Sequence, residues 1–233
     1  MLRSQIPLVT TKADAAYVEI HRRIVEGELP PGTVLDQGAL ARELNVSTTP
    51  VREALRRLEM EKLVEMSAHR DARVVPASPQ HFRYLYEVRL ELDPLAAGLA
   101  AERATKAEID AIARVASAQG RTALKQASVN RRFHRAVYSS CHNPVLVDQL
   151  DSLWDRTDSY RLALLSAYPS EAVLANHEHT AIATAIRDRN AAEVRALVRA
   201  HLEDSFSKVE SLMETDSTAP AAAAGSQKPI GRK

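Results

Sequence analysis

Apolar residues recur every three or four positions along most of the chain, the spacing typical of amphipathic helices. Residues 15–27 carry this pattern and end at Gly27, which predicts a helix stopped by a glycine. Residues 37–44 predict a short helix. After a tight break, residues 48–62 predict the strongest helix of the chain, whose apolar stripe is Val51, Leu55 and Leu58.

The ends of this strongest helix and the residues after it predict a compact motif. We expect Thr49 to cap the helix and Pro50 to fit its first turn. Apolar runs at 63–66 and 72–75 predict two strands, whereas 29–35 (LPPGTVL) predicts a turn. A short helix, a tight turn, a longer helix and a two-strand wing together predict a winged helix-turn-helix.

Prolines in VPASPQ (75–80) separate this motif from a second region, which reads as helix after helix. Helix starts are expected at Ser78, Asn143 and Asn190, and capping-box spacing occurs at Thr105 with Glu108 and Asn190 with Glu193. The predicted fold is mainly α: a flexible arm (1–12), a winged helix-turn-helix of three helices plus a small two-strand wing (13–76), an antiparallel α-helical bundle (79–213) and a disordered tail (214–233).

Composition adds limits on location. The net charge of +1 indicates neither nucleic-acid binding nor membrane binding, so any DNA affinity must come from where the charges are placed. No apolar run approaches the roughly 18 residues that cross a bilayer. A lone cysteine, Cys141, fits a reducing compartment. We therefore expect a cytoplasmic protein without membrane contact.

In a helix-turn-helix the second helix lies in the major groove, and its first residues meet base edges. The candidate DNA-binding residues are Ser47, Thr48, Thr49, Arg52 and Arg56, with His69 and Arg70 from the wing. The alternative is a well-capped amphipathic helix that only packs in a bundle. The short helix before it and the wing after it favour DNA binding.

Histidine spacing predicts a metal site in the second region. Asn130 and His134 lie four apart on one helix face, and His179 and His201 lie at similar distances from a turn near residues 189–190. In an antiparallel helix pair these two histidines are level. Three imidazoles plus one oxygen suit zinc, nickel or another divalent transition ion. The alternative is that each histidine is a satisfied core or surface residue.

The segment ALARELNVSTTPVREALRRLEMEKLVE (39–65) resembles the DNA-binding half of the GntR family of transcriptional regulators. Thr48 stands where that family usually has Arg, and Lys62 and Asp71 stand where glycine is common. The resemblance implies an operator-binding regulator, a homodimer in most members, and many members are repressors. The altered residue at 48 implies a different operator preference.

The second region resembles the FCD domain of the FadR subfamily, through FRYLYEVRLELDPLAAGLAAERAT (82–105), NRRFHRAVYSSCHNPVL (130–146) and the two later histidine helices. The resemblance implies a ligand set of an acid and three histidines, which falls on Asn130, His134, His179 and His201. Asn in place of Asp implies weaker metal binding but a stronger attraction for an anionic effector. Some relatives sense acyl chains without metal, so metal-free sensing stays open.

The resemblance also implies a small carboxylate as effector, with Arg89 as its partner and Tyr160 and Arg161 in the pocket. The alternative for Arg89 is a salt bridge to Glu91 or Asp93. For the chain as a whole, alternatives to an effector-responsive regulator are a metal-responsive regulator and a metal-dependent hydrolase. The hydrolase is disfavoured because no paired general acid and base accompany the histidines. Glu178 adjoins His179, and we expect it on a different helix face.

Overall fold

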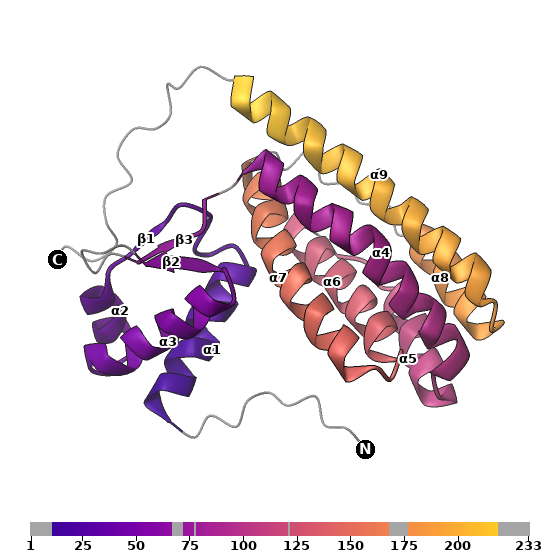
Figure 1. Cartoon of the computed structure of the whole chain (residues 1–233), viewed down its shortest axis with the longest axis horizontal. Helices are drawn as coiled ribbons and strands as arrows, with labels where there is room; N and C mark the ends of the chain where they lie inside the picture. The colour runs from indigo at the N-terminus through magenta and orange to yellow at the C-terminus, as the bar shows by residue number, and fades with distance from the viewer. Residues whose placement is uncertain (1–10, 67–71, 77, 121, 168–176, 219–233) are drawn as a thin grey trace. The chain divides into compact units, whose positions relative to one another are not determined.

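A computed structural model describes residues 11–66, 72–76, 78–120, 122–167 and 177–218, and these divide into two compact units with the main boundary between residues 77 and 78. The first unit (Figure 1) contains α1 (Lys12–Val25), α2 (Gln37–Glu43) and α3 (Thr48–Met60), with strands β1 (Val34–Leu35), β2 (Val64–Met66) and β3 (Ala72–Val74). It has the winged helix-turn-helix fold that the sequence predicts.

The sheet has three strands in the antiparallel order β1-β3-β2. The two predicted wing strands, β2 and β3, are confirmed, and β1 adds a third strand that the sequence did not predict. Residues 34 and 35 were assigned to a turn, but Val34 pairs with Arg73 and Leu35 with Ala72. A two-residue strand is too short to give an alternating pattern. It forms because β3 offers it a free edge.

The core of the first unit contains the predicted stripe of Val51, Leu55 and Leu58, all fully buried, packed with Ile20 and Ile24 of α1. Helix α3 begins at Thr48 with Ser47 as its N-cap, so the expected cap, Thr49, lies inside the first turn instead. The turn before it closes through Asn45, whose φ of 53° is left-handed. That closure brings the helix start forward.

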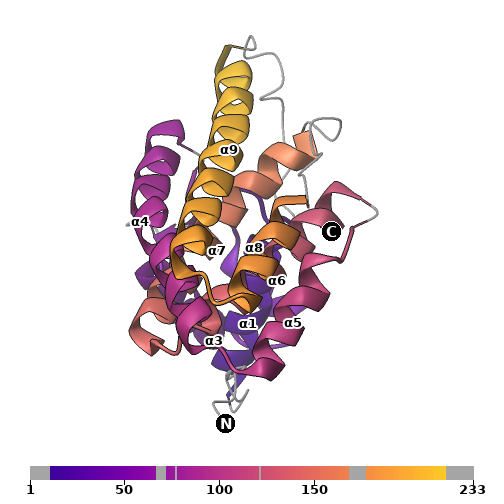
Figure 2. The same ribbon diagram turned by 90° about the vertical axis from the view of Figure 1, so that its right-hand side faces the viewer.

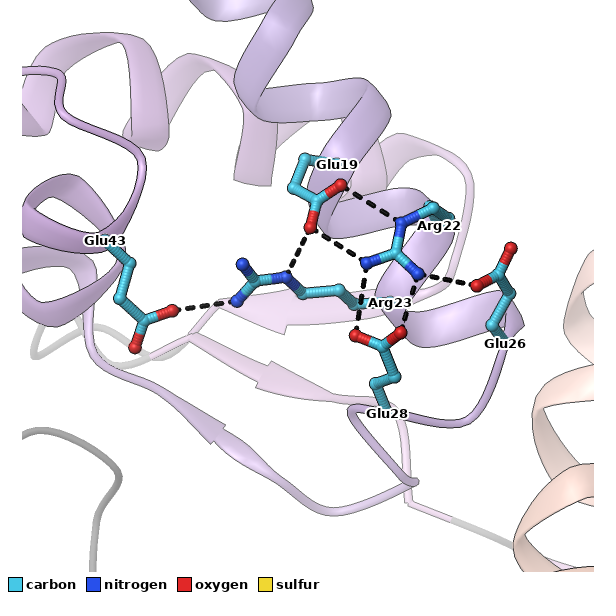
Figure 3. A network of polar contacts seen from close by, with 6 residues as sticks. All are labelled: Glu19, Arg22, Arg23, Glu26, Glu28 and Glu43. Atoms are coloured by element: carbon cyan, nitrogen blue, oxygen red, sulfur yellow. Dashed lines mark hydrogen bonds and ion pairs between the residues drawn. The ribbon is translucent and has the colours of Figure 1, made fainter.

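A network of charged side chains joins α1 to α2 and to the segment after α1 (Figure 3): Glu19, Arg22, Arg23, Glu26, Glu28 and Glu43. Arg23 bridges Glu19 at 2.7 Å and Glu43 of α2 at 2.8 Å. Hydrogen bonds from Arg22 and Arg23 lower the pKa of Glu19 to about 2. The network ties the first helix of the helix-turn-helix to α1.

The second unit is an antiparallel bundle of α4 (Pro79–Arg103), α5 (Lys106–Ala116), α6 (Ala123–Ser139), α7 (Pro144–Ala167), α8 (His177–Arg187) and α9 (Ala191–Thr218). Helix α4 packs along α9, and α8 packs against α9 and α5 (Figure 2). Among the described residues, no helix is both long and apolar enough to cross a membrane.

The predicted helix starts in this unit are confirmed. Ser78 caps α4, and Thr105 and Glu108 form a reciprocal capping box on α5. Asn190 caps α9 by accepting from the Glu193 backbone N–H, and its side-chain amide donates to the Glu193 carboxylate. Helix α9 continues to Thr218, past the expected start of the tail at 214. The rest of that tail and residues 1–10 of the arm lie outside the described residues.

Candidate DNA-reading helix and histidine centre

Helix α3 turns one face to the core and the opposite face outward. Ser47, Thr48, Thr49, Arg52 and Arg56 are all exposed, and the two arginines are one turn apart on the outward face. The Ser47 side chain makes no capping hydrogen bond. The first backbone N–H groups of α3 therefore have no acceptor from this side chain. His69 and Arg70, the candidates from the wing, lie outside the described residues.

Arg57, the neighbour of Arg56, has a structural contact instead. Its Nη1 lies 2.8 Å from Asp14 Oδ1, and its guanidinium carbon lies 4.0 Å from the centre of the Tyr17 ring. The Tyr17 hydroxyl in turn donates to Glu61 at 2.8 Å. These contacts hold α3 against α1, which leaves Arg56 as the arginine of this pair that faces outward.

Three histidines from three helices meet inside the second unit. His134 comes from α6, His179 from α8 and His201 from α9, and one ring nitrogen of each lies within 4.8 Å of the others. His134 Nε2 and His201 Nε2 are 3.0 Å apart. All three side chains are buried. The structure therefore brings together the histidines that the sequence analysis grouped.

The residues at this centre fit a transition-metal ion. Both ring nitrogens of His179 are buried and have no hydrogen-bond partner among the described residues, an arrangement that costs about 1–3 kcal/mol per orphaned group. Burial is the main cause that lowers the pKa of His134, of His201 and of His179, the last to about 3. All three imidazoles are therefore neutral at pH 7, the state that ligates metal.

Asn130 is also buried, one turn before His134 on α6. This spacing puts both side chains on one face of the helix. The Asn130 amide oxygen is the uncharged counterpart of the carboxylate that the FCD resemblance implies at this position.

Glu178 corrects an expectation. We expect it on a different helix face from His179, with no acid or base beside the histidines, but its Oε2 accepts a hydrogen bond from His201 Nδ1. Glu178 and His179 are consecutive on α8, and both reach His201 on α9. Helical phase within α8 could not reveal this contact because it depends on how α8 packs against α9.

Arg89 lies next to the histidine centre and is completely buried. Its Nε donates to Asp93 at 3.1 Å, and its guanidinium carbon lies 3.6 Å from the centre of the Trp154 ring. The Trp154 indole N–H donates to the other Asp93 oxygen at 2.9 Å, and that ring lies 4.6 Å from the His134 ring. The salt bridge weighed for Arg89 is therefore present, with Asp93 as its partner.

This salt bridge leaves the other edge of the guanidinium unsatisfied. Arg89 Nη1 and Nη2 are buried without a hydrogen-bond partner among the described residues. Arg161 on α7 is buried as well, and its charge acts on all three histidines. Tyr160 precedes it on α7 and is also buried. The centre thus combines neutral imidazoles with two buried arginines, of which Arg89 is paired with Asp93 through one edge only.

A winged helix-turn-helix followed by a helical bundle is the architecture of a DNA-binding transcriptional regulator. The model for "Bacterial regulatory proteins, gntR family" matches residues 12–74, and the FCD domain model matches residues 84–204. The chain therefore belongs to the gntR family of bacterial regulatory proteins and carries an FCD domain.

Curated relatives and a solved structure agree with this assignment. The chain is 31% identical over 164 residues to the galactonate operon transcriptional repressor of Escherichia coli (strain K12), covering 60% of this chain and 71% of the relative. It is 30% identical over 185 residues to the Nta operon transcriptional regulator of Aminobacter aminovorans, covering 77% and 85%. The structure of E. coli McbR/YncC matches the fold with a TM-score of 0.78 at 22% identity, over 88% of this chain and 99% of that chain.

The lowered pKa of His179 predicts a pH-dependent stability. Because the folded pKa is about 3 and the unfolded value is 6.5, the unfolded chain binds a proton that the folded chain rejects between these values. Stability is therefore complete above pH 6.5 and falls as the pH is lowered. By pH 5 this histidine alone should reduce the free energy of unfolding by about 2 kcal/mol.

The measurement is the unfolding midpoint of the second unit between pH 7.5 and 5, with EDTA present. His179→Leu, which removes the titrating group, should flatten the acid side of the curve. His142→Asn, at an exposed histidine paired with Glu108, is the control and should change the acid side of the curve much less than His179→Leu does. An equal acid sensitivity in wild type and His179→Leu would contradict the prediction.

Proposed function

We propose that this chain is a transcriptional repressor whose binding to an operator is modulated by a small carboxylate, bound beside a divalent transition metal in the FCD domain. The observation that carries this proposal is the buried centre of His134, His179 and His201, with Arg89 beside it, in which ring and guanidinium nitrogens have no partner. The name of the E. coli relative, a galactonate operon repressor, supports both repression of transcription and a carboxylate effector.

For DNA reading, α3 enters the major groove. Arg52, one turn into the helix, reaches a base edge, where a bidentate contact to guanine discriminates by roughly 1–3 kcal/mol. Arg56 contacts a phosphate, and Ser47, Thr48 and Thr49 lie at the helix start where amides and hydroxyls meet the backbone. His69 and Arg70 add contacts from the wing.

For the metal, His134, His179 and His201 supply imidazole nitrogens and Asn130 an amide oxygen. When bound, the ion would offer an open coordination position to a carboxylate oxygen. The protein orients the four ligands on α6, α8 and α9 and excludes water by burial. The neutral ligand set also supports a second candidate, a regulator for which an exchangeable ion is itself the signal.

For the effector, the unpaired edge of Arg89 presents two N–H groups in the geometry that matches a carboxylate. Arg161, whose charge acts on all three histidines, adds to the proposed pocket, whereas Tyr160 is a candidate from the family resemblance alone. A hydrolase is less well supported, because the carboxylate that the described residues bring to the histidines, Glu178, already accepts from His201.

We also propose that two copies pair, as operators with two half-sites require. Helix α4 supports this. One of its sides is buried in the bundle, while Tyr84, Val88 and Leu95 on another side are 54%, 46% and 40% exposed. A helix with apolar residues on both sides is normally covered on both, and a second copy can cover this one in a twofold contact.

Arg52→Ala tests DNA reading. Sites are first selected by the wild-type protein from a random duplex library, and affinities are then measured on the selected site. Arg52→Ala should weaken binding roughly 10- to 100-fold and relax the preference at one base pair. Arg56→Ala should weaken all duplexes alike and reduce the salt slope by about one.

Arg114→Ala, an exposed arginine on α5, is the control for loss of charge and should behave as wild type. Failure to enrich any sequence, or equal effects of Arg52→Ala and Arg114→Ala, would refute sequence reading by α3. One chain per selected duplex in sedimentation would refute the pairing of two copies.

Elemental analysis of untagged protein tests the metal. Wild type should hold about one zinc or nickel ion per chain, because the described residues bring together one histidine cluster. His134→Ala should lose it. Asn130→Asp adds a charged ligand and should tighten binding by about tenfold, or about 1.4 kcal/mol.

His142→Asn again serves as the control and should keep the ion. If neither wild type nor His134→Ala holds metal after soaking in zinc or nickel, the metal proposal fails and the histidines would form the effector pocket themselves. Unchanged affinity in Asn130→Asp would remove Asn130 from the ligand set.

Arg89→Lys tests the effector pocket, because lysine keeps the charge beside Asp93 but loses the planar fork. Galactonate and gluconate at millimolar concentration should raise the melting temperature of the wild-type second unit by several degrees, since ligand binding stabilises the folded state. Arg89→Lys should abolish the shift, whereas Arg199→Lys, at an exposed ion pair, should keep it. An equal shift with uncharged galactose would argue against a carboxylate effector.

A further inference from the structure

Glu178 and His179 lie side by side in the first turn of α8 and contact the same residue of α9. His179 lies with its ring centre 5.0 Å from that of His201, on the inner side of the cluster. Glu178 reaches the other ring nitrogen of His201, Nδ1, and accepts its hydrogen bond. The His201 ring is therefore held between a carboxylate at Nδ1 and His134 at Nε2.

We infer that Glu178 is a positioning residue that fixes His201 as the Nδ1–H tautomer, with the Nε2 lone pair directed into the centre. A neutral imidazole carries one N–H, so a ring that donates from Nδ1 has an unprotonated Nε2. A carboxylate that holds the outer N–H of a histidine ligand sets its tautomer and ring orientation and raises its basicity. The inference rests on the proposed metal function of the same site.

The same hydrogen bond determines the proton positions in the metal-free protein. Since His201 Nε2 is an acceptor, the 3.0 Å contact between the two Nε2 atoms requires His134 to donate. His134 is then the Nε2–H tautomer. His134 has to move this proton to Nδ1 before its Nε2 can act as a ligand, whereas His201 is already in the form that a ligand needs.

The position of Glu178 suits this role. The first turn of a helix favours a negative charge, and Glu178 is in the first turn of α8. Its side chain is 43% exposed, whereas that of His201 is 10% exposed. The carboxylate therefore keeps part of its hydration while it contacts a buried ring.

The test uses metal-free, full-length protein labelled with ¹⁵N-histidine, in which nitrogen chemical shifts report the tautomer of each ring. We expect His201 as Nδ1–H and His134 as Nε2–H in wild type. Glu178→Ala should give His201 a mixture of tautomers, and Glu178→Gln, which keeps an acceptor, should lie between the two. Glu203→Ala, which removes an exposed glutamate of α9, is the matched control.

The second readout is zinc affinity, measured by competition with a chelator. Glu178→Ala should weaken zinc binding roughly 10- to 100-fold, Glu178→Gln less, and Glu203→Ala not at all. An Nε2–H tautomer of His201 in wild type, or a zinc affinity unchanged in Glu178→Ala, overturns the inference even if wild type binds zinc. If wild type binds no zinc, the metal function fails, while the tautomers still decide whether Glu178 orients His201.

Discussion

The interior of the helical bundle contains polar groups that the protein does not satisfy by itself. Both nitrogens of His179 and two nitrogens of Arg89 are buried without partners among the described residues, and each such group costs stability. Apolar side chains of similar volume would remove this cost. A bundle that keeps these groups beside His134 and His201 fits the proposed bound group, which would supply the missing interactions, and the packing of α6, α8 and α9 brings the candidate ligands together.

His179 and His201 lie at the same height along their helices because of the turn between α8 and α9. Arg189 has a φ of 58° there, and its guanidinium donates to the carbonyl oxygens of Ala101 and Ala104 at the end of α4, at 2.9 and 2.7 Å. Asn190 caps α9 in the next position. The turn is therefore held by its own capping residue and by hydrogen bonds to α4. His179 and His201, each about two turns or more from it, lie opposite each other as a result.

The features that could be predicted from the sequence are those set by residues close together along the chain. Helix periodicity gave the stripe of α3, capping residues gave the starts of α5 and α9, and equal distances from one turn grouped His179 with His201. Three features depend on packing between elements and left no periodic signal: the pairing of β1 with β3, the contact of Arg57 with Tyr17, and the hydrogen bond from His201 to Glu178. At Lys62, where a glycine is common, the backbone is left-handed all the same, with a φ of 62°. The backbone conformation at this position is therefore kept although the residue differs.

The charge of the proposed site sets the chemistry of its ligand. Three neutral imidazoles and an amide would carry no charge to offset that of a divalent ion. The buried Arg89 and Arg161 add positive charge, of which Asp93 beside Arg89 and Glu178 beside His201 offset part. In a medium of low dielectric constant such an excess is unfavourable unless an anion joins it. A structural zinc site would instead be closed by four protein ligands, usually cysteine and histidine. With asparagine at position 130, a carboxylate effector would supply a negative charge that the proposed ligand set lacks, which would couple ion binding to effector binding.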